Sequence, residues 1–208
     1  MNLWITISSI GAVAALMAIF CVTVYNRLVV LRSNCENAFA QIETQLKRRY
    51  DLIPNLVECV KSYMAHEAKT LESVIAARNK AAAGLAQATQ QPQNPDVLEK
   101  WMGAESALNS ALGRLNVVIE AYPNLKADAS VAGLTEELTS TENRIAYARQ
   151  SYNDWVTGFN TSRLSFPNCL FAGVLGFDRN RKHLEFADSE KLVVAPRVML
   201  ARRRPIQI

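Results

Sequence analysis

The chain has 208 residues, of which 50% are hydrophobic and 20% are charged, so it is neither a disordered polar chain nor a bundle made only of membrane-spanning helices. It contains 8 glycines and 7 prolines, a low content that disfavours turn-rich β-sandwiches and barrels and favours long helices. Residues 1–177 carry 15 basic and 15 acidic side chains, whereas residues 178–208 carry 8 and 4, so the net charge of +4 lies in the last part of the chain. A body without excess basic charge is not expected to bind nucleic acid.

Residues 3–25 form the first predicted element, a membrane-spanning helix. This stretch of 23 residues contains no charged side chain. At about 1.5 Å per residue it is about 34 Å long, enough to cross a hydrocarbon core of about 30 Å. A cleaved signal peptide is the main alternative, but no basic residue precedes the stretch and no small-x-small cleavage site lies near its end.

Basic residues follow the apolar stretch and none precedes it. The nearest of them are Arg27, Arg32, Lys47, Arg48 and Arg49. The positive-inside rule therefore predicts a single-pass protein with residues 1–2 outside and the body in the cytoplasm. The four cysteines, at positions 21, 35, 59 and 169, show no CxxC spacing. Neither a zinc site nor a disulfide framework is expected, and no metal or cofactor is predicted.

The next predicted helix carries an apolar or small residue at every third or fourth position, with one gap at Arg49. These positions are Leu28, Leu31, Cys35, Ala38, Ile42, Leu46, Ile53, Leu56, Val60 and Met64. Pro54 interrupts the pattern, because proline lacks a backbone donor and disfavours helical angles at Ile53. We therefore expect a turn or sharp kink over residues 50–54, followed by a second helix that ends near Ala88.

A polar, proline-punctuated loop is predicted over residues 87–95, and a third helix after it. Asn94 and Pro95 provide an N-cap and a first helical residue, and Pro123 closes the helix. The positions expected to face inward are Leu98, Trp101, Leu108, Leu112, Leu115 and Ile119.

The fourth predicted helix has the most regular pattern of the chain, because its apolar positions alternate steps of four and three. They are Leu134, Leu138, Thr141, Ile145, Ala148, Tyr152, Trp155 and Phe159. Such a heptad seam is typical of a bundle or coiled-coil contact. Trp155, like Trp101, is expected in the core.

These elements predict an all-α fold, in which the N-terminal transmembrane helix is followed by an antiparallel up-and-down bundle of four long helices over residues 26–166. The first bundle helix then leads away from the membrane and the fourth returns toward it. A long first helix, kinked at Pro54 and followed by two returning helices, is the alternative packing.

Several motifs along the chain resemble those of the LemA family, in order from about residue 20 to residue 186. They are YNRLV (25–29), KRRYDLIPNLV (47–57), HE (66–67), YPNLKA (122–127), TENRIAYARQSYN (141–153), FNT (159–161), FP (166–167) and GF (176–177). The resemblance implies a mostly helical antiparallel bundle with one N-terminal membrane helix, in the bacterial inner membrane, and no established enzymatic activity. Some members of the family are associated with membrane remodelling in magnetosome formation, and others occur alongside membrane zinc peptidases. Residues 167–186 form an apolar segment and the family's C-terminal end, and residues 187–208 are predicted to be a basic variable tail.

No constellation of residues predicts catalysis. HEAKT at 66–70 begins like the HExxH motif, but Thr70 stands where the second metal ligand is needed. His183 is interpreted as a solvated surface residue. Three glutamates of the fourth helix are interpreted as a solvated face, because no nucleophile or glycine-rich loop accompanies them: Glu136, Glu137 and Glu142. We therefore expect no enzyme.

The polar motif residues are expected to specify structure or interaction. They are Arg48, Arg49, Asp51, Pro54, Asn55, Thr141, Glu142, Asn143, Arg144, Arg149, Tyr152 and Asn153. Our hypothesis is that Arg48, Arg49 and Asp51 pair with polar groups at 141–144 or 152–153, within one subunit or between subunits. The alternative is that these residues are simply a cluster of charges near a helix end, without a specific partner.

Residues 166–177 are twelve uncharged residues, too few to span a bilayer. One interpretation is that they fold back over the bundle and pack into its core. The other is that the fourth helix delivers them to the membrane interface, where they contact lipid or the next subunit. The residues expected to make such contacts are Phe166, Leu170, Phe171, Leu175 and Phe177.

Four arginines near the C-terminus, Arg197, Arg202, Arg203 and Arg204, are either part of a solvated end or a contact to anionic lipid. The sequence as a whole predicts a non-catalytic, membrane-anchored helical scaffold that self-assembles and organises membrane proteins or the membrane. An accessory subunit of a membrane enzyme, such as a zinc metallopeptidase, is the alternative. The expected partners are membrane lipid, further copies of the chain and another membrane protein.

Overall fold

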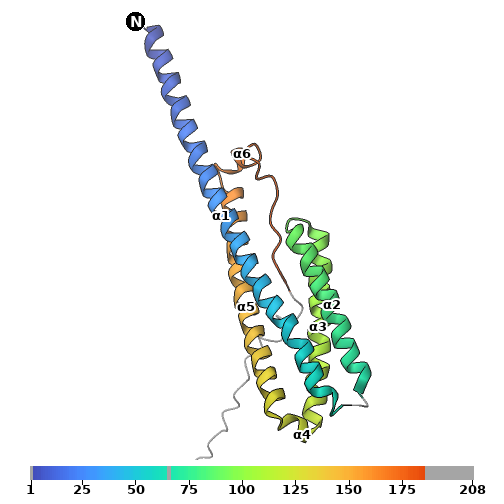
Figure 1. Ribbon diagram of the computed structural model, residues 1–208. Helices are drawn as coiled ribbons and strands as arrows, with labels where there is room; N and C mark the ends of the chain where they lie inside the picture. Colours follow the sequence, from blue (N-terminus) through green and yellow to red (C-terminus); the bar gives the residue numbers. More distant parts are fainter. Residues whose placement is uncertain (1, 65–66, 186–208) are drawn as a thin grey trace, which may run out of the picture.

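A computed structural model describes residues 2–64 and 67–185, which form six helices joined by loops, with no strand among them (Figure 1). The helices are α1 (Asn2–Lys61), α2 (Ala68–Gln90), α3 (Pro95–Ala121), α4 (Pro123–Lys126), α5 (Ala129–Leu164) and α6 (Cys169–Ala172). The all-α fold predicted from the sequence is therefore confirmed.

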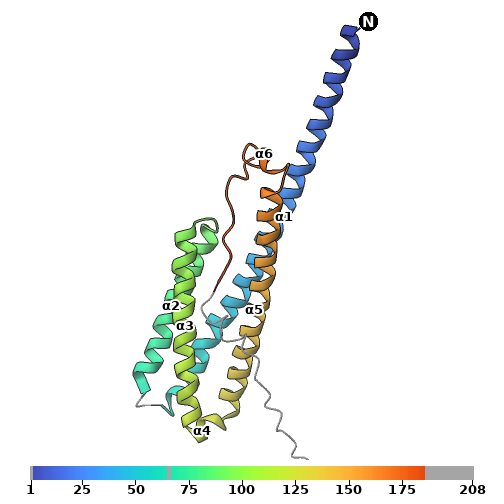
Figure 2. The same ribbon diagram turned by 180° about the vertical axis from the view of Figure 1, so that it is seen from behind.

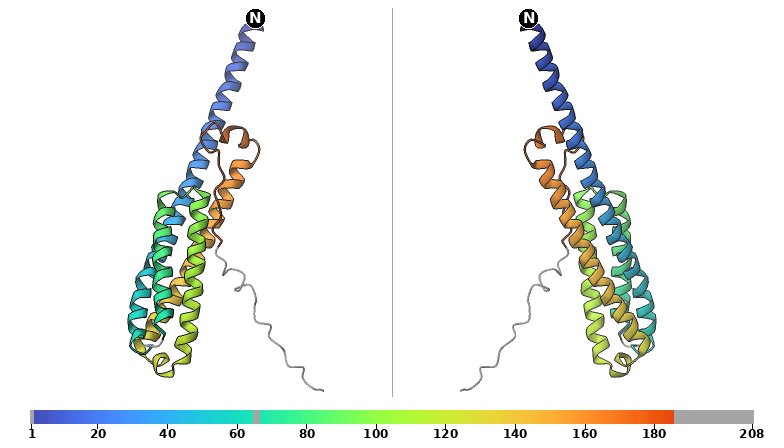
Figure 3. Two further views of the ribbon diagram at one scale, coloured as in Figure 1. Left: turned by 90° about the vertical axis from the view of Figure 1, so that its right-hand side faces the viewer. Right: turned by 90° about the vertical axis from the view of Figure 1, so that its left-hand side faces the viewer.

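Helix α1 is a single helix of 60 residues, which at about 1.5 Å per residue is about 90 Å long. Its N-terminal part projects alone beyond the bundle, and its C-terminal part is the first bundle helix (Figures 1 and 3). Apolar side chains such as Trp4, Ile10 and Leu16 are exposed along the projecting part. Among the described helices, this one is long and apolar enough to cross a membrane.

Of the turn or sharp kink expected at residues 50–54, the turn is wrong, because α1 continues as helix through Pro54 and ends at Lys61. Pro54 removes the N–H that would bond to the carbonyl of Tyr50, four residues earlier. That carbonyl instead accepts a hydrogen bond from Nε of Arg78 on α2, at 3.0 Å. A side chain from the neighbouring helix thus satisfies the group that proline leaves unpaired, and the second helix begins at Ala68 rather than soon after Pro54.

The four long helices run up and down, as predicted. Helix α1 descends from the projecting end, α2 returns, α3 descends again, and α5 returns toward the apolar part of α1 (Figures 1 and 2). The bundle part of helix α1 packs most extensively against α5 and also against α2, and α2 packs against α3. Direct contact between α3 and α5 is sparse, so the bundle is open along that side.

The apolar stripes predicted for the helices form the core, with one exception on α5. Trp101 is fully buried in α3, and Leu138, Ile145 and Tyr152 are buried in α5. Trp155 is 40% exposed, however, and its neighbour Val156 is buried in its place. A straight helix of 3.6 residues per turn drifts by about 20° per heptad from a strict seven-residue repeat, so the buried stripe has moved to the next position.

Candidate functional site

The segment 166–177, which includes α6, lies beside α1 near the end of the apolar stretch (Figure 1). The ring of Phe171 packs 5.9 Å from that of Phe20, and the ring of Phe177 lies 5.9 Å from that of Tyr25. Phe20 precedes Arg27, the first charged residue, by seven positions, or about 10 Å along the helix. The segment is therefore level with the last part of the apolar stretch.

The two faces of this segment differ. Phe177 is buried, while Phe171 and Leu175 are half-buried against the bundle. Phe166, Leu170 and Val174 point outward, with 81%, 63% and 90% of their surface exposed. We call these three residues the α6 face. One side of the segment thus packs onto the bundle, as the first interpretation predicts, and Phe177 is buried there rather than available to lipid. The other side leaves large apolar groups uncovered beside α1, and their contact with lipid or another subunit stays a prediction.

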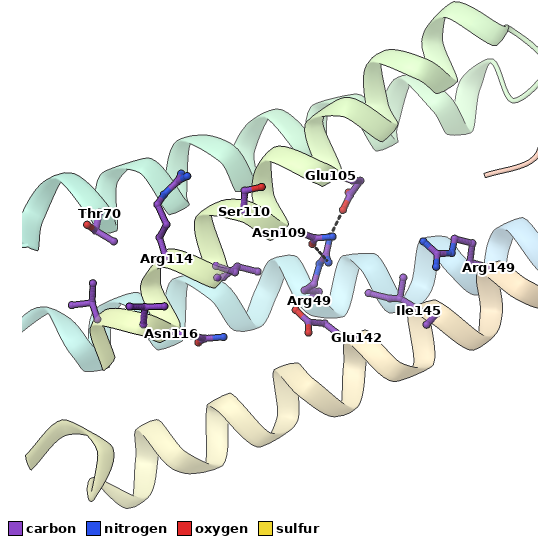
Figure 4. A pocket seen from close by; sticks show the side chains of 15 residues that line it. Arg49, Thr70, Glu105, Asn109, Ser110, Arg114, Asn116, Glu142, Ile145 and Arg149 are labelled. Atoms are coloured by element: carbon purple, nitrogen blue, oxygen red, sulfur yellow. Dashed lines mark hydrogen bonds and ion pairs between the residues drawn. The ribbon is translucent and has the colours of Figure 1, made fainter. Parts of the chain in front are cut away.

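A second polar feature lies inside the bundle, where Arg49 and Glu105 form a buried ion pair between α1 and α3 (Figure 4). Their side chains are 3% and 1% exposed. The Glu105 carboxylate also accepts hydrogen bonds from the Tyr50 hydroxyl and, at 3.2 Å, from Trp101 Nε1. Arg49 donates a further bond to Asn109 Oδ1 at 2.8 Å. Burial and the negative charge of Glu105 raise the pKa of Tyr50 above its ordinary value, so its hydroxyl stays a donor.

The sequence contains a signal for this pair, which becomes visible when the apolar stripes of α1 and α3 are compared. The apolar stripe of α1 has its one gap at Arg49, between Leu46 and Ile53. The stripe of α3 has a gap at Glu105, between Trp101 and Leu108. Each charge occupies an inward position, and the two gaps carry opposite charge. Two complementary charges in facing stripes are the pattern of a buried ion pair.

Within the described chain, Arg48, Arg49 and Asp51 all pair at positions other than the predicted 141–144 and 152–153. Arg48 pairs with Glu137 at 2.6 Å, and Asp51 lies 3.9 Å from Arg78 of α2. Arg49 pairs with Glu105, a residue that the prediction did not include. Arg49 nevertheless lies near the TENR motif (141–144), because Glu142 of that motif lines the same cavity, as does Arg149 further along α5 (Figure 4).

The remaining motif residues divide between surface and interior. Asn55, Asn143 and Arg144 are exposed. Thr141 is buried, and its hydroxyl donates to the Glu137 carbonyl of the preceding turn at 2.8 Å. Pairing between subunits stays a prediction.

Tyr152 and Asn153 hold residues 177–185, which we call the strap, against α5 (Figure 2). The Asn153 amide donates to the Leu184 carbonyl at 3.0 Å and accepts from its N–H at 2.9 Å. Asn160 makes the same two bonds to Arg181, at 2.9 and 3.0 Å. Seven helical residues span about 10.5 Å and three extended residues about 10 Å, so the spacings match. Burial raises the pKa of Tyr152 to about 12, which keeps its hydroxyl protonated as a donor to Lys182 O at 3.3 Å.

Charged side chains join the strap to the other helices. Arg181 pairs with Glu36 of α1 at 2.9 Å, and Lys182 with Glu99 of α3 at 3.0 Å. Burial alone would raise the pKa of Glu36, but hydrogen bonds from Arg32 and Arg181 hold it below its ordinary value. His183 is half-buried with its Nε2 2.9 Å from the Thr157 hydroxyl, so it is not the solvated residue predicted.

Below the strap, the open side of the bundle forms a groove of about 840 Å³ between α3 and α5 (Figure 4). Its walls include residues from Glu105 to Val118 on α3 and from Glu142 to Arg149 on α5, with Arg49 at its base. Arg114 has no ion-pair partner in the part of the chain that the structure describes.

Within residues 2–64 and 67–185, no group of three or more histidine, cysteine, aspartate or glutamate side chains is placed to hold a metal ion. His66 of the HEAKT sequence lies outside the described residues, and so do Arg197, Arg202, Arg203 and Arg204. The contact between these arginines and anionic lipid stays a prediction.

Three relatives cover most of the chain. Magnetosome protein MamQ 2 of Paramagnetospirillum magneticum is 25% identical over 213 residues, which cover 90% of this chain and 78% of the relative. Magnetosome protein MamQ of Magnetospirillum gryphiswaldense is 24% identical over 84% of this chain and 70% of its own length. Protein LemA of Metamycoplasma hominis is 27% identical over 70% of this chain and 62% of its own length.

The profile of the LemA family matches residues 38–199. The match reaches beyond residue 186, where the resemblance based on motifs ended, so part of the stretch predicted to be a variable tail is shared with the family. The chain belongs to the LemA family.

Proposed function

We propose that this protein is a non-catalytic, membrane-anchored helical scaffold that assembles with copies of itself and organises membrane proteins or the membrane. The observation that carries the proposal is the position of the α6 face. Phe166, Leu170 and Val174 lie uncovered at the level where the apolar stretch of α1 ends. Large apolar side chains gathered at one surface favour contact with lipid or protein over water.

Two contacts with the bilayer would fix the orientation of the bundle. The apolar part of α1 is continuous with the first bundle helix, so no flexible linker separates anchor and body. The α6 face adds a second contact beside the first. The body then stands on the cytoplasmic side of the bacterial inner membrane, as the basic residues after the apolar stretch favour. A body held at a defined angle presents the same helical surface on every copy, which suits assembly.

Light scattering of the full-length protein in detergent tests self-assembly, beside a variant that lacks residues 1–26. The proposal predicts discrete particles much larger than one chain in its detergent micelle for the full-length protein purified alone. A protein that remains a single chain at all concentrations contradicts it. The truncated variant shows whether assembly requires the membrane helix.

An accessory subunit for a membrane enzyme is the second candidate, and the groove between α3 and α5 favours it. The groove combines charged, amide and apolar side chains, and apolar walls with a few polar groups are typical of clefts that bind ligands. Such a subunit stays small when purified alone and forms a larger particle only when its enzyme, for example a zinc metallopeptidase, is added.

A further inference from the structure

The end of the bundle next to the apolar stretch carries an excess of basic charge. It consists of residues 26–36 of α1 and residues 155–182, which include the last turns of α5, α6 and the first part of the strap (Figure 1). We call these two ranges the basic end. Their charged side chains are Arg27, Arg32, Arg163, Arg179, Arg181 and Lys182, with Glu36 and Asp178. The first five residues of α3 add two more acidic side chains, Asp96 and Glu99, and the balance is still positive when they are counted.

Carboxylates neutralise only part of this charge. The Glu36 carboxylate is shared by two guanidinium groups, at 3.0 Å from Arg32 and 2.9 Å from Arg181. Arg179 lies 3.7 Å from Asp178, with 80% and 69% of the two side chains exposed, so solvent weakens this pair. One carboxylate between two arginines leaves one positive charge over, and the loose pair at Arg179 can exchange its partner for another anion.

Arg163 is held in place by neutral groups. Its half-buried guanidinium donates to the carbonyls of Phe177 and Asp178, at 3.4 and 3.0 Å, and from Nε to Asn180 Oδ1, at 3.1 Å. With the bond from Nη2 to the same oxygen, these contacts use at most four of its five N–H donors. No carboxylate forms an ion pair with Arg163 within the described residues. The guanidinium is therefore fixed in position with its charge left to attract an anion.

A cleft of about 60 Å³ adjoins these arginines. Its walls include Arg32, Arg179 and Asn180, whose side chain also binds Arg163. Because a water molecule takes up about 30 Å³, the cleft has room for one compact group only. Among the described residues, four basic ones and one acidic one, Asp178, line it. A compact anion suits such walls, and the oxygens of a phosphate match the donor fork of arginine.

The basic end lies at the depth of lipid phosphates when α1 crosses a bilayer. Arg27 and Arg32 lie about 3 and 10 Å beyond Tyr25, the last residue of the apolar stretch. The headgroup layer reaches about 5–8 Å beyond the hydrocarbon core on each side, and an arginine side chain can extend back toward it. The ring contact between Tyr25 and Phe177 puts the first residues of the strap at the same level.

Building on the membrane contact proposed above for the α6 face, we propose that the basic end binds the phosphate group of an anionic phospholipid. Arg163 and Arg179 bind the phosphate, with Arg32 in the wall of the same cleft, and the α6 face contacts the acyl chains. A zwitterionic phospholipid carries an ammonium group beside its phosphate, which the excess of basic charge repels. The site therefore selects anionic lipid over zwitterionic lipid.

Quenching by brominated lipid tests the proposal in the full-length protein. Phe166→Trp places a fluorescent reporter on the α6 face, and Trp4→Phe removes the exposed tryptophan of the apolar stretch. The protein is reconstituted in equal amounts of phosphatidylglycerol and phosphatidylcholine, with one or the other brominated near the headgroup end of its acyl chains. The expected quenching corresponds to a several-fold enrichment of phosphatidylglycerol beside residue 166.

The failure of this site differs from the failure of the membrane contact on which it rests. Equal quenching by the two brominated lipids shows that the α6 face reaches lipid and overturns the headgroup site alone. Quenching by neither lipid contradicts the membrane contact, and the headgroup site with it.

Substitutions locate the site. Arg179→Gln, at a side chain that is 80% exposed, should lower the enrichment about two-fold without unfolding the protein. Arg163→Gln should lower it further, whereas Arg163→Lys, which keeps the charge, should retain most of it. Lys126→Gln is the matched control, because Lys126 is exposed on α4 at the opposite end of the bundle (Figure 1). An equal loss in Lys126→Gln and Arg179→Gln would show a general effect of net charge and overturn the site.

Inorganic phosphate distinguishes a lipid site from a site for a free anion. At constant ionic strength, added phosphate should leave the enrichment of phosphatidylglycerol unchanged, because the acyl chains also hold the lipid at the α6 face. Loss of the enrichment as phosphate is added would assign the cleft to a soluble anion and overturn the lipid as its ligand.

Discussion

Removing one partner of the buried Arg49–Glu105 pair should destabilise the bundle far more than removing a partner of an exposed pair. Arg49→Met leaves the Glu105 carboxylate, 1% exposed, without its countercharge and, among the described residues, with hydrogen bonds from Tyr50 and Trp101. Breaking a buried ion pair costs about 3–5 kcal/mol. In a domain of this size 1 kcal/mol corresponds to a shift in Tm of about 2–4 °C, so the expected loss is about 6–20 °C.

The neighbouring Arg48→Met provides the matched control, because Arg48 and Glu137 are 48% and 40% exposed. An exposed pair contributes about 0–1 kcal/mol, so the expected loss is about 4 °C or less. Thermal unfolding of the full-length proteins in detergent is followed by far-ultraviolet circular dichroism. The double variant Arg49→Met with Glu105→Leu should recover most of the lost stability, because no unpaired charge remains. If Arg49→Met lowers Tm no more than Arg48→Met, the pair does not have the role assigned to it.

Three further predictions concern the strap and Pro54. Asn153→Ala removes both hydrogen bonds to Leu184 and should cost about 1–3 kcal/mol. Hydrogen exchange should become faster in the strap alone, whereas Asn143→Ala, at an exposed position, should leave exchange unchanged. Equal effects of the two substitutions would refute the assignment. Arg78→Met leaves the Tyr50 carbonyl without its donor and should lower the free energy of unfolding by about 1–3 kcal/mol, measured by denaturant unfolding. In a Pro54→Ala background, residue 54 has an N–H that can bond the same carbonyl, so Arg78→Met should lower the free energy of unfolding less. An equal decrease in both backgrounds would contradict the explanation for the continuous helix. Because Glu36 has a lowered pKa in the folded state, its ion pairs stabilise the strap above the ordinary pKa of 4.5 and lose this effect as pH falls through the folded pKa. Hydrogen exchange of the strap, corrected for intrinsic rates, should therefore become faster in acid, and Glu36→Gln should abolish this acceleration. If the Glu36→Gln variant still shows the acceleration, Glu36 is not its source.

The sequence predicts the helices well because their buried stripes depend on local periodicity. Leu28 to Val60 on α1, apart from the gap at Arg49, and Leu98 to Ile119 on α3, apart from the gap at Glu105, repeat every three or four residues, and the core uses these positions. The break expected at Pro54 does not occur, since its cause lies in a contact distant in sequence, the bond from Arg78 to Tyr50. Local rules cannot include a donor that arrives from another helix.

The polar sites depend on tertiary contacts in the same way. A single charge in an apolar stripe resembles a gap until the facing stripe is known, which is why the partnership of Arg49 and Glu105 was not predicted. Asn153 belongs to a recognisable motif, but its partner Leu184 lies in a strap without a periodic pattern. By contrast, residues 166–177 were identified as a candidate contact from their lack of charge alone, and the fold brings them beside α1.

The depth of the α6 face in a bilayer tests the proposed second membrane contact most directly. A nitroxide label is attached at Leu170→Cys, and separately at Val117→Cys, an exposed apolar position on α3, in full-length protein whose four native cysteines are replaced by alanine. In reconstituted bilayers, electron paramagnetic resonance compares collisions with oxygen, which concentrates in lipid, and with a water-soluble nickel complex. The account predicts that the label at 170 is protected from nickel and accessible to oxygen, whereas the label at 117 shows the reverse. Equal accessibility to nickel at both positions would contradict it.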